Sequence, residues 1–229
     1  MLVNPKAIMR DQRTKLIGEM EGRRARWYAR QRMTPSQLTV VRERARRLEA
    51  SVNAGAKVLE VASGPGLLAI ELARSGRLSV VGLDVSPTMV EIANENAARE
   101  RIAVQFQQGD VARLPFADAS FDLVICQAAF KNFTEPKRAL DEIYRVLTPG
   151  GRAEIDDLSR EASTAEIGAE VGRMGLSRFN AFLTKWILAT VLRRRAYSRA
   201  QIEQLASSSA FGSCRFVRDG IGFTVTLSR

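Results

Sequence analysis

The residues best suited to chemistry lie in one short stretch, Val58–Gly66, where an apolar run ends in an acid and breaks into a glycine-containing turn. The apolar residues that follow predict a helix. A strand that turns sharply into a helix directs the free N–H groups and the dipole of the helix out of the turn. Glycine lets the bulk of a ligand lie against the backbone there. Residues 58–72 therefore predict a site for a nucleotide-type cofactor.

Two cofactors fit this stretch. Gly64–Ala69 satisfies the G-x-G-x-x-G/A dinucleotide fingerprint, and Asp84 follows at about the spacing of the ribose-binding acid. Glu60, inside the end of the strand, is unusual for a dinucleotide turn, and there it could face a bound ammonium group. S-adenosylmethionine (SAM) carries an ammonium and a carboxylate on its methionine end and has no pyrophosphate. A purely structural strand–turn–helix with an incidental acid is the third alternative.

The composition predicts one globular domain over residues 1–229, because 229 residues with 45% apolar content can bury a sizeable core. Cys126 and Cys214 are too few for a disulfide framework or a metal cluster, so we expect a cytoplasmic protein without a metal. The sequence shows neither a signal peptide nor an apolar run long enough for a membrane span. Histidine is absent, which removes the commonest general base.

The net charge of +10 comes mostly from arginine. Such basicity favours nucleic acid, anionic lipid or an acidic substrate as a partner. The arginines concentrate in two regions, residues 23–47 and residues 193–199. Solvated helix faces are the simpler explanation for both clusters.

The hydrophobic pattern alternates between strands and helices, which predicts a Rossmann-like, doubly wound α/β fold with a mostly parallel sheet. Near the end, two apolar runs flank Asp219-Gly220, a hairpin signal that closes the seven-stranded sheet with an antiparallel pair. Residues 1–50 form an N-terminal helical segment, residues 157–197 a helical insert after the fifth strand, and Pro149–Gly151 a turn. The first five strands are predicted at 57–62, 78–83, 102–107, 121–126 and 152–155.

Five motifs occur in an order and spacing that resemble class I SAM-dependent methyltransferases. Within that class the chain looks most like the small-molecule enzymes that include the ubiquinone/menaquinone C-methyltransferases. Each motif alone is weak evidence for this resemblance, but five in order are strong, and together they cover residues 57–155. The motifs are Val58–Gly66, Val81–Asp84, Gly109–Phe116, Ser120–Val124 and Glu142–Gly151.

In an open α/β sheet, ligands bind beyond the carboxyl ends of the strands, where these motifs end. Asp84 can accept both ribose hydroxyls, Val85 and Met89 can pack against adenine, and Asp110 can accept from the adenine amino group, unless it is only an Asx turn or helix cap. Ala62 stands where the family usually has glycine, and it is tolerable where φ is negative. The cofactor residues expected from the resemblance are Glu60, Ala62, Ser63, Gly64, Gly66, Asp84, Val85, Met89, Gly109, Asp110, Val111 and Gln127.

Methyl transfer from a sulfonium is an in-line displacement, so the protein mainly supplies alignment and desolvation. Where the acceptor must lose a proton, Asp156 and Asp157 at the end of the fifth strand are the acidic candidates, with Gln127 close by; the alternative is a helix cap or a solvent-facing pair. The insert is expected to form a lid or wall over an apolar acceptor, with helix packing, a homodimer interface or contact with an anionic membrane surface as alternatives. The acceptor-side residues are Phe130, Lys131, Asn132, Phe133, Phe182 and Trp186, with Phe179 from the same insert.

The expected function is a SAM-dependent methyltransferase with a small, apolar or aromatic acceptor, anionic acceptors included. The adenine-methylating signature Asn/Asp-Pro-Pro-Tyr/Phe is absent after the fourth strand, where the chain has Gln127–Phe130. That argues against methylation of adenine in nucleic acids. There are two alternatives. One is an RNA methyltransferase whose arginines bind the RNA, and the other is a SAM-fold protein that no longer transfers methyl.

Overall fold

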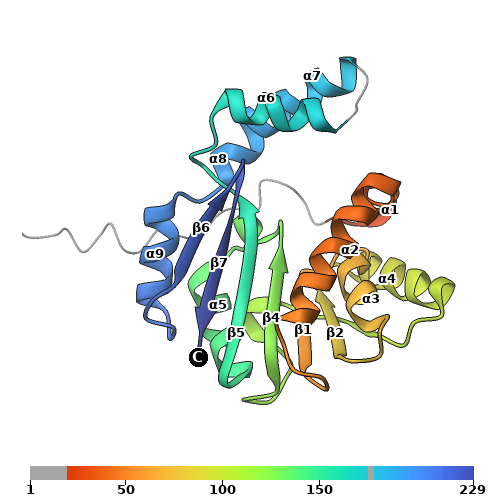
Figure 1. Ribbon diagram of the computed structural model, residues 1–229, viewed down its shortest axis with the longest axis vertical. Helices are drawn as coiled ribbons and strands as arrows, with labels where there is room; N and C mark the ends of the chain where they lie inside the picture. Colours follow the sequence, from red (N-terminus) through yellow and green to blue (C-terminus); the bar gives the residue numbers. More distant parts are fainter. Residues whose placement is uncertain (1–19, 175–177) are drawn as a thin grey trace, which may run out of the picture.

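The computed structural model describes residues 20–174 and 178–229, and it shows one seven-stranded sheet with helices on both faces (Figure 1). The strand order is β3-β2-β1-β4-β5-β7-β6. The first five strands are parallel, whereas β7 runs antiparallel to β5 and β6. The predicted fold is confirmed. The strands are β1 (Lys57–Val61), β2 (Ser79–Asp84), β3 (Gln105–Gln108), β4 (Phe121–Gln127), β5 (Leu147–Leu158), β6 (Arg215–Asp219) and β7 (Gly222–Ser228).

The helices begin where the sequence places proline or a capping residue. Pro35, Pro87 and Pro136 each stand at the first turn of a helix, where a missing N–H costs nothing. The capping box of Ser198 and Gln201 is present. The helices are α1 (Gly22–Arg32), α2 (Pro35–Ala50), α3 (Leu67–Ala73), α4 (Pro87–Glu100), the short η2 (Val111–Arg113) and η3 (Phe130–Asn132), α5 (Pro136–Val146), α6 (Thr164–Arg173), α7 (Arg178–Ile187), the π-helix η4 (Leu188–Leu192), α8 (Arg193–Arg195) and α9 (Arg199–Ser208).

Alternate residues of the central strands pack into two separate hydrophobic cores, one on each face of the sheet. On one face, Leu59 and Val61 of β1 belong to a cluster that includes residues of α5 and α9. On the other face, Val58 packs with residues of α2, α3 and α4. This period of two is the geometry of a strand buried on both sides. It also means that neighbouring polar residues at a strand end serve opposite faces of the sheet.

The fifth strand is longer than predicted. The expected turn at Pro149–Gly151 is wrong, because β5 runs through it from Leu147 to Leu158. Its pairing with β4 shifts register between Phe121 and Leu123, and Gly150 has a φ of 81°. The glycines therefore produce a bulge that lets the strand continue, rather than a turn that separates it from the preceding helix.

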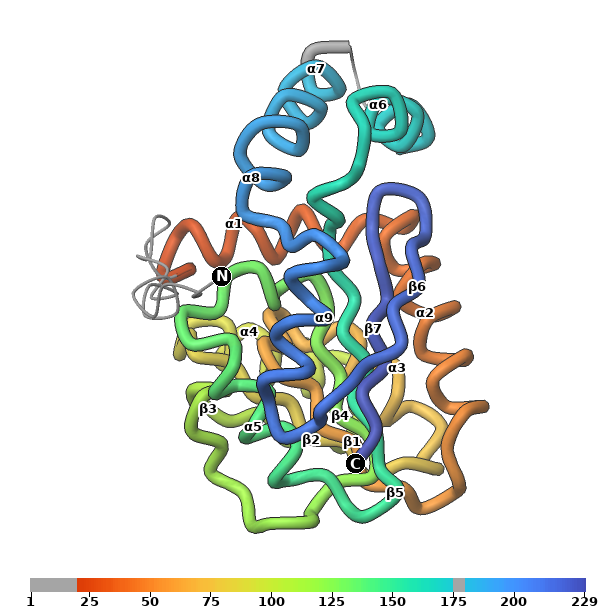
Figure 2. Tube along the Cα trace, turned by 90° about the vertical axis from the view of Figure 1, so that its left-hand side faces the viewer, coloured from red at the N-terminus to blue at the C-terminus, as the bar shows by residue number. Residues whose placement is uncertain are grey.

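Two helical segments lie at the carboxyl ends of the parallel strands. Helix α1 lies across this edge and packs on α4, with Ala25 and Ala29 against Met89 and Ile92. The α6–α8 insert projects beyond the edge (Figures 1 and 2). Residues 1–19, part of the predicted N-terminal segment, lie outside the described residues. None of the described helices has the length and apolar character needed to cross a lipid bilayer.

Candidate active site

The loop between β1 and α3 depends on two glycines in the left-handed region. Gly64 has a φ of 53° and Gly66 a φ of 76°. A Cβ on Gly66 would lie 2.5 Å from the Phe106 ring, so a larger residue would also clash with the core. The glycines thus hold the first turn of α3 close to the sheet, as the sequence pattern predicts for this loop.

Glu60 is turned toward α3. Its carboxylate is 4% exposed, and Oε2 accepts a hydrogen bond of 3.0 Å from the backbone N–H of Ala69, in the first turn of that helix. Burial raises the pKa of Glu60 to about 8, against the hydrogen bond from Ala69, which lowers it. At neutral pH the side chain is therefore mostly protonated, and it satisfies an N–H that α3 cannot pair internally.

Asp84 joins the loops that follow β1 and β2. Its Oδ2 accepts from the Gly64 N–H at 2.8 Å, and its Oδ1 accepts from the Ser86 N–H at 2.9 Å. Its backbone oxygen accepts from the Gly109 N–H at 2.9 Å, which adds the loop after β3. Burial raises the pKa of this carboxyl. Next to it, the buried Ser63 Oγ has no hydrogen-bond partner among the described residues.

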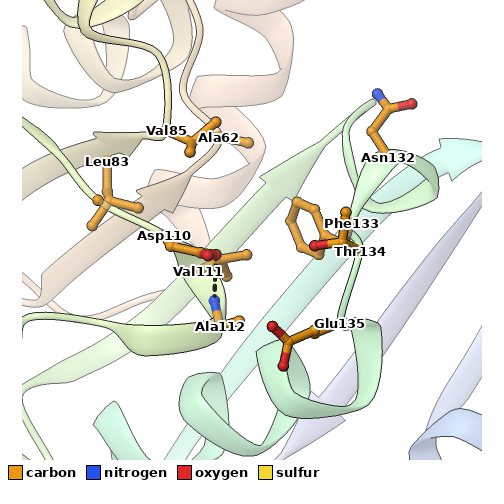
Figure 3. Close-up of a pocket in the computed structure, with 11 residues that line it drawn as sticks. Ala62, Leu83, Val85, Asp110, Val111, Ala112, Asn132, Phe133, Thr134 and Glu135 are labelled. Atoms are coloured by element: carbon orange, nitrogen blue, oxygen red, sulfur yellow. Dashed lines mark hydrogen bonds between the residues drawn. The ribbon is translucent and has the colours of Figure 1, made fainter. Parts of the chain in front are cut away.

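A cavity of about 120 Å³ opens beside these loops (Figure 3), and we call it the cofactor cavity because the sequence predicts a cofactor at these strand ends. Asp110 lies in its wall and caps η2, since Oδ1 accepts from the Ala112 N–H at 2.9 Å. Asp110 is exposed, so this cap leaves it accessible to a ligand. The cofactor cavity is lined by Ala62, Leu83, Val85, Gly109, Asp110, Val111, Ala112, Asn132, Phe133, Thr134 and Glu135.

Five of the expected cofactor residues line this cavity, namely Ala62, Val85, Gly109, Asp110 and Val111. The other seven do not: Glu60, Ser63, Gly64, Gly66, Asp84, Met89 and Gln127. Met89 is 3% exposed and packs beneath α1, outside the cofactor cavity, whereas Val85 is 48% exposed at its wall. Ala62 has a φ of 54°, so the tolerance expected for a negative φ does not apply, and its methyl is held in a sparsely populated conformation.

A second, larger cavity of about 620 Å³ adjoins the ends of β4 and β5, and we call it the acceptor cavity because the sequence predicts the acceptor there. Asn132 lines both cavities. Helix α1, the π-helix and the β6–β7 hairpin supply the remaining walls, so the cavity combines segments from both ends of the chain. It is lined by Met20, Tyr28, Arg32, Gln127, Ala128, Lys131, Asn132, Asp156, Asp157, Leu158, Leu188, Leu192, Asp219, Ile221, Gly222, Phe223 and Thr224.

A buried ion pair lies in the wall of the acceptor cavity. Lys131 Nζ is 2.7 Å from Asp157 Oδ1, and the two side chains are 8% and 1% exposed. The Lys131 N–H also donates to Asp157 Oδ2, at 2.8 Å, and Nζ donates to the Ala128 carbonyl. Ala128, directly after β4, has a φ of 57°. It is thus a second alanine of the site in the left-handed region, as Ala62 is after β1.

Asp156 faces the opposite side of the sheet, toward α2. It is hydrogen-bonded to Arg44 and to the Thr224 hydroxyl. Arg44 also contacts Glu154 Oε2 at 3.0 Å. Burial raises the pKa of Asp156, while Arg44 and Thr224 oppose that shift. Asp156 and Asp157 are thus both partnered, the first by an arginine and the second by a lysine.

The aromatic residues expected on the acceptor side are dispersed. Phe130 is 1% exposed and packs between the Phe133 and Tyr197 rings, each at 5.3 Å between centroids, so it is part of the core. Phe133 lines the cofactor cavity instead. Phe182 and Trp186 are 70% and 53% exposed on α7, and neither lines the acceptor cavity. The side chain of Phe179 lies outside the described part of the structure.

Several lining residues were not anticipated from the sequence. Tyr28 and Arg32 share one face of α1, and Leu188 and Leu192 begin and end the π-helix. Each pair is spaced four residues apart, which is a signal for a shared helix face. The signal does not say what that face covers. A π-helix is rare and is frequently found at functional sites.

Comparison with known proteins agrees with this geometry. Residues 59–155 match the model of the methyltransferase domain family. Over 121 residues the chain is 41% identical to a demethylmenaquinone methyltransferase of Deinococcus radiodurans, covering 52% of this chain and 50% of that protein. It is 37% identical over 118 residues to an arsenite methyltransferase of Halobacterium salinarum, covering 49% and 30%. The chain spans about half the length, or less, of these curated relatives.

The fold has solved counterparts as well. The crystal structure of a SAM-dependent methyltransferase from Aquifex aeolicus superposes with a TM-score of 0.66 at 19% identity, covering 88% of this chain and 97% of that one. This protein therefore has the class I methyltransferase fold. The segment that matches the methyltransferase domain family, residues 59–155, lies within this fold.

Proposed function

We propose that the protein transfers a methyl group from SAM to a small, largely apolar acceptor bound in the acceptor cavity. The observation that carries this proposal is the pair of adjoining cavities with Asn132 in the wall of both. Such an arrangement allows a donor at the ends of β1–β3 and an acceptor at the ends of β4 and β5 to meet. Proximity of this kind supplies much of the rate of a displacement reaction.

The residues around the cofactor cavity suit SAM. SAM carries an ammonium group and ribose hydroxyls, which need hydrogen-bond acceptors. Acidic side chains that can accept these bonds line or adjoin this cavity. Gly64 gives room for a ligand against the backbone, because a Cβ at this position would meet no atom within 4 Å. Bound there, SAM supplies an electrophilic methyl group. The protein's residues would fix its orientation and exclude water.

The acceptor is proposed to be an aromatic, quinol-like molecule. The apolar walls of the acceptor cavity, Leu188, Leu192, Ile221 and Phe223, suit a ring or a short lipid tail. The polar groups at the strand ends suit ring oxygens. The demethylmenaquinone methyltransferases among the relatives support this class, although the arsenite methyltransferase shows that similar sequences serve other acceptors.

We assign the role of proton acceptor, where one is needed, to Asp156 rather than Asp157. Both line the acceptor cavity and both are ion-paired, but the side chain of Asp156 is 21% exposed and that of Asp157 only 1%. Burial raises the pKa of Asp156, which makes its carboxylate a better base. Gln127, in the same wall, is suited to orient the acceptor by hydrogen bonds.

Methyl transfer from labelled SAM tests this proposal. The full chain is incubated with a demethylmenaquinol of short prenyl tail, an unprenylated naphthoquinol, arsenite or bulk RNA, and S-adenosylhomocysteine release is measured. We expect release and labelled product with a naphthoquinol. Label retained in RNA at moderate salt, or no release with any acceptor while SAM binds, would contradict it. The Asp156→Asn variant should lose turnover of the quinol and keep SAM affinity.

A further inference from the structure

Helix α7 exposes an apolar surface that the proposed function does not use. Phe182 is 70% exposed, Trp186 53% and Leu183 42%, and Val191 on the π-helix that follows is 40% exposed. We call these four residues the α7 surface. The other side of the same helical run packs on α6, since Ala181, Leu188 and Ala189 contact Ile167 and Val171. The run is therefore apolar on two sides, of which α6 covers only one.

The segment around the α7 surface carries one sign of charge. From Val171 to Ile202 the sequence contains no Asp or Glu. Two cations near its limits are paired with acids outside it, Arg173 with Glu170 and Arg199 with Glu203. Lys185 and Arg194 are exposed closer to the apolar residues. The basic residues of the segment are Arg173, Arg178, Lys185, Arg193, Arg194, Arg195 and Arg199.

The position of the α7 surface links it to the acceptor cavity. The α6–α8 insert is the part of the described chain that projects furthest beyond the carboxyl edge of the sheet (Figures 1 and 2). Leu188 and Leu192, in the helix that continues α7, line the acceptor cavity. An apolar molecule that leaves a surface contacting α7 would thus reach the cavity along one continuous helical run.

We propose that the α7 surface docks on an anionic lipid surface. Exposed Trp and Phe beside Lys and Arg are the composition of helices that lie in a membrane interface, where the aromatic rings enter the headgroup region and the cations face anionic lipids. A second copy of the chain fits less well, because two such segments would bring their cations together and neither segment contains an acid to pair with them. The docking does not depend on methyl transfer.

Tryptophan fluorescence reports the docking directly. The chain has two tryptophans, and Trp27→Phe leaves Trp186 as the reporter. This variant is mixed with vesicles of phosphatidylglycerol and phosphatidylcholine, or of phosphatidylcholine alone, without cofactor or acceptor. We expect a blue shift and quenching by brominated lipid with the anionic vesicles, weakened by salt. An unshifted spectrum with the anionic vesicles would overturn the proposal.

Paired variants locate the contact. Phe182→Ser/Trp186→Ser should reduce co-sedimentation with anionic vesicles at least tenfold, whereas Val40→Ser/Val217→Ser, which removes exposed apolar residues on α2 and β6, should not. Equal binding by both pairs would contradict the assignment. A protein that does not bind vesicles would also contradict it if sedimentation velocity showed a dimer that only the Phe182→Ser/Trp186→Ser variant abolishes. Because no cofactor is present, this failure is distinguishable from failure of the methyltransferase proposal.

Discussion

The cofactor half and the acceptor half of the site are built in different ways. At the ends of β1, β2 and β3, backbone N–H groups of Gly64, Ser86 and Gly109 converge on one residue, Asp84. At the ends of β4 and β5, side chains from distant segments pair instead, as Arg44 does with Asp156 and Lys131 with Asp157. The hydrogen bonds of the cofactor half are formed within the loops after the strands. The ion pairs of the acceptor half depend on which segments pack against the sheet.

The two halves also differ in how much of the chain they use. Seven of the eleven residues that line the cofactor cavity lie between Ala62 and Ala112, and the other four are the consecutive residues Asn132–Glu135. The acceptor cavity takes its walls from α1, the π-helix and the β6–β7 hairpin. We therefore expect changes in those segments to affect the binding of the acceptor more than the binding of SAM. The experiments below either separate the two halves or show that they are coupled, beginning with the largest expected effect.

Removal of Asp157 should destabilise the acceptor half most. Asp157→Ala leaves Lys131 buried without its partner carboxylate, and losing one member of a buried pair costs about 3–5 kcal/mol. Urea unfolding measures the loss. The double variant Lys131→Met/Asp157→Leu should recover much of it, because neither charge then remains. A loss for Asp157→Ala below about 1 kcal/mol would show that water reaches the pair.

The buried acid of the cofactor half should make stability depend on pH. The pKa of Glu60 rises from 4.5 to about 8 on folding, so the folded state holds the extra proton between these values. The free energy of unfolding should therefore fall as pH rises from 4.5 to 8, by roughly 3–5 kcal/mol. Glu60→Gln lacks this proton. Parallel curves for the wild type and the variant across that window would refute the assignment.

Asp84 should control cofactor binding more than any other single carboxylate. Asp84→Ala removes the carboxylate proposed to accept from ribose hydroxyls and its hydrogen bond with the Gly64 N–H, so SAM affinity should fall at least about tenfold. Asp110→Ala, which removes a cap at the edge of the same cavity, should have a smaller effect. Calorimetry measures both, with circular dichroism to confirm the fold. An unchanged dissociation constant in Asp84→Ala would place the cofactor elsewhere.

A substitution in the acceptor cavity should leave the cofactor half untouched. Leu188→Trp partly fills the cavity, so the KM for a naphthoquinol should rise several-fold while SAM affinity stays constant. Leu183→Trp, on the exposed side of α7, is the matched control and should alter neither. If Leu188→Trp weakened SAM binding as much as acceptor binding, the two halves would not be separable.

The smallest effects should come from the two strained alanines, one in each half. Ala62 and Ala128 have φ values of 54° and 57°, where glycine is favoured. Glycine at either position should raise the free energy of unfolding by up to about 1 kcal/mol. Ala98→Gly, in the exposed part of α4, should lower it by about as much. Destabilisation by both loop glycines would mean that the alanine methyls make packing contacts that outweigh the strain.

The sequence predicted the cofactor half better than the acceptor half, for a physical reason. The order of strands and the polar residues that end them are local signals, so the fold and the positions of Asp84 and Asp110 could be predicted. Pairings such as Arg44 with Asp156 join residues 112 positions apart, and no periodicity reports them. The period of a helix does not say which apolar face is buried, and so Phe182 was expected where Leu188 lies. The left-handed φ of Ala62 likewise could not be predicted, because alanine rarely adopts this conformation.

The most direct test of the two-cavity account is a crystal structure of the chain with S-adenosylhomocysteine and a naphthoquinol. The account predicts the adenosine beside Val85 and Asp110, and the quinol in the acceptor cavity, with one of its carbons or oxygens facing the sulfur past Asn132. A quinol bound outside that cavity, or a sulfur directed away from it, would contradict the account.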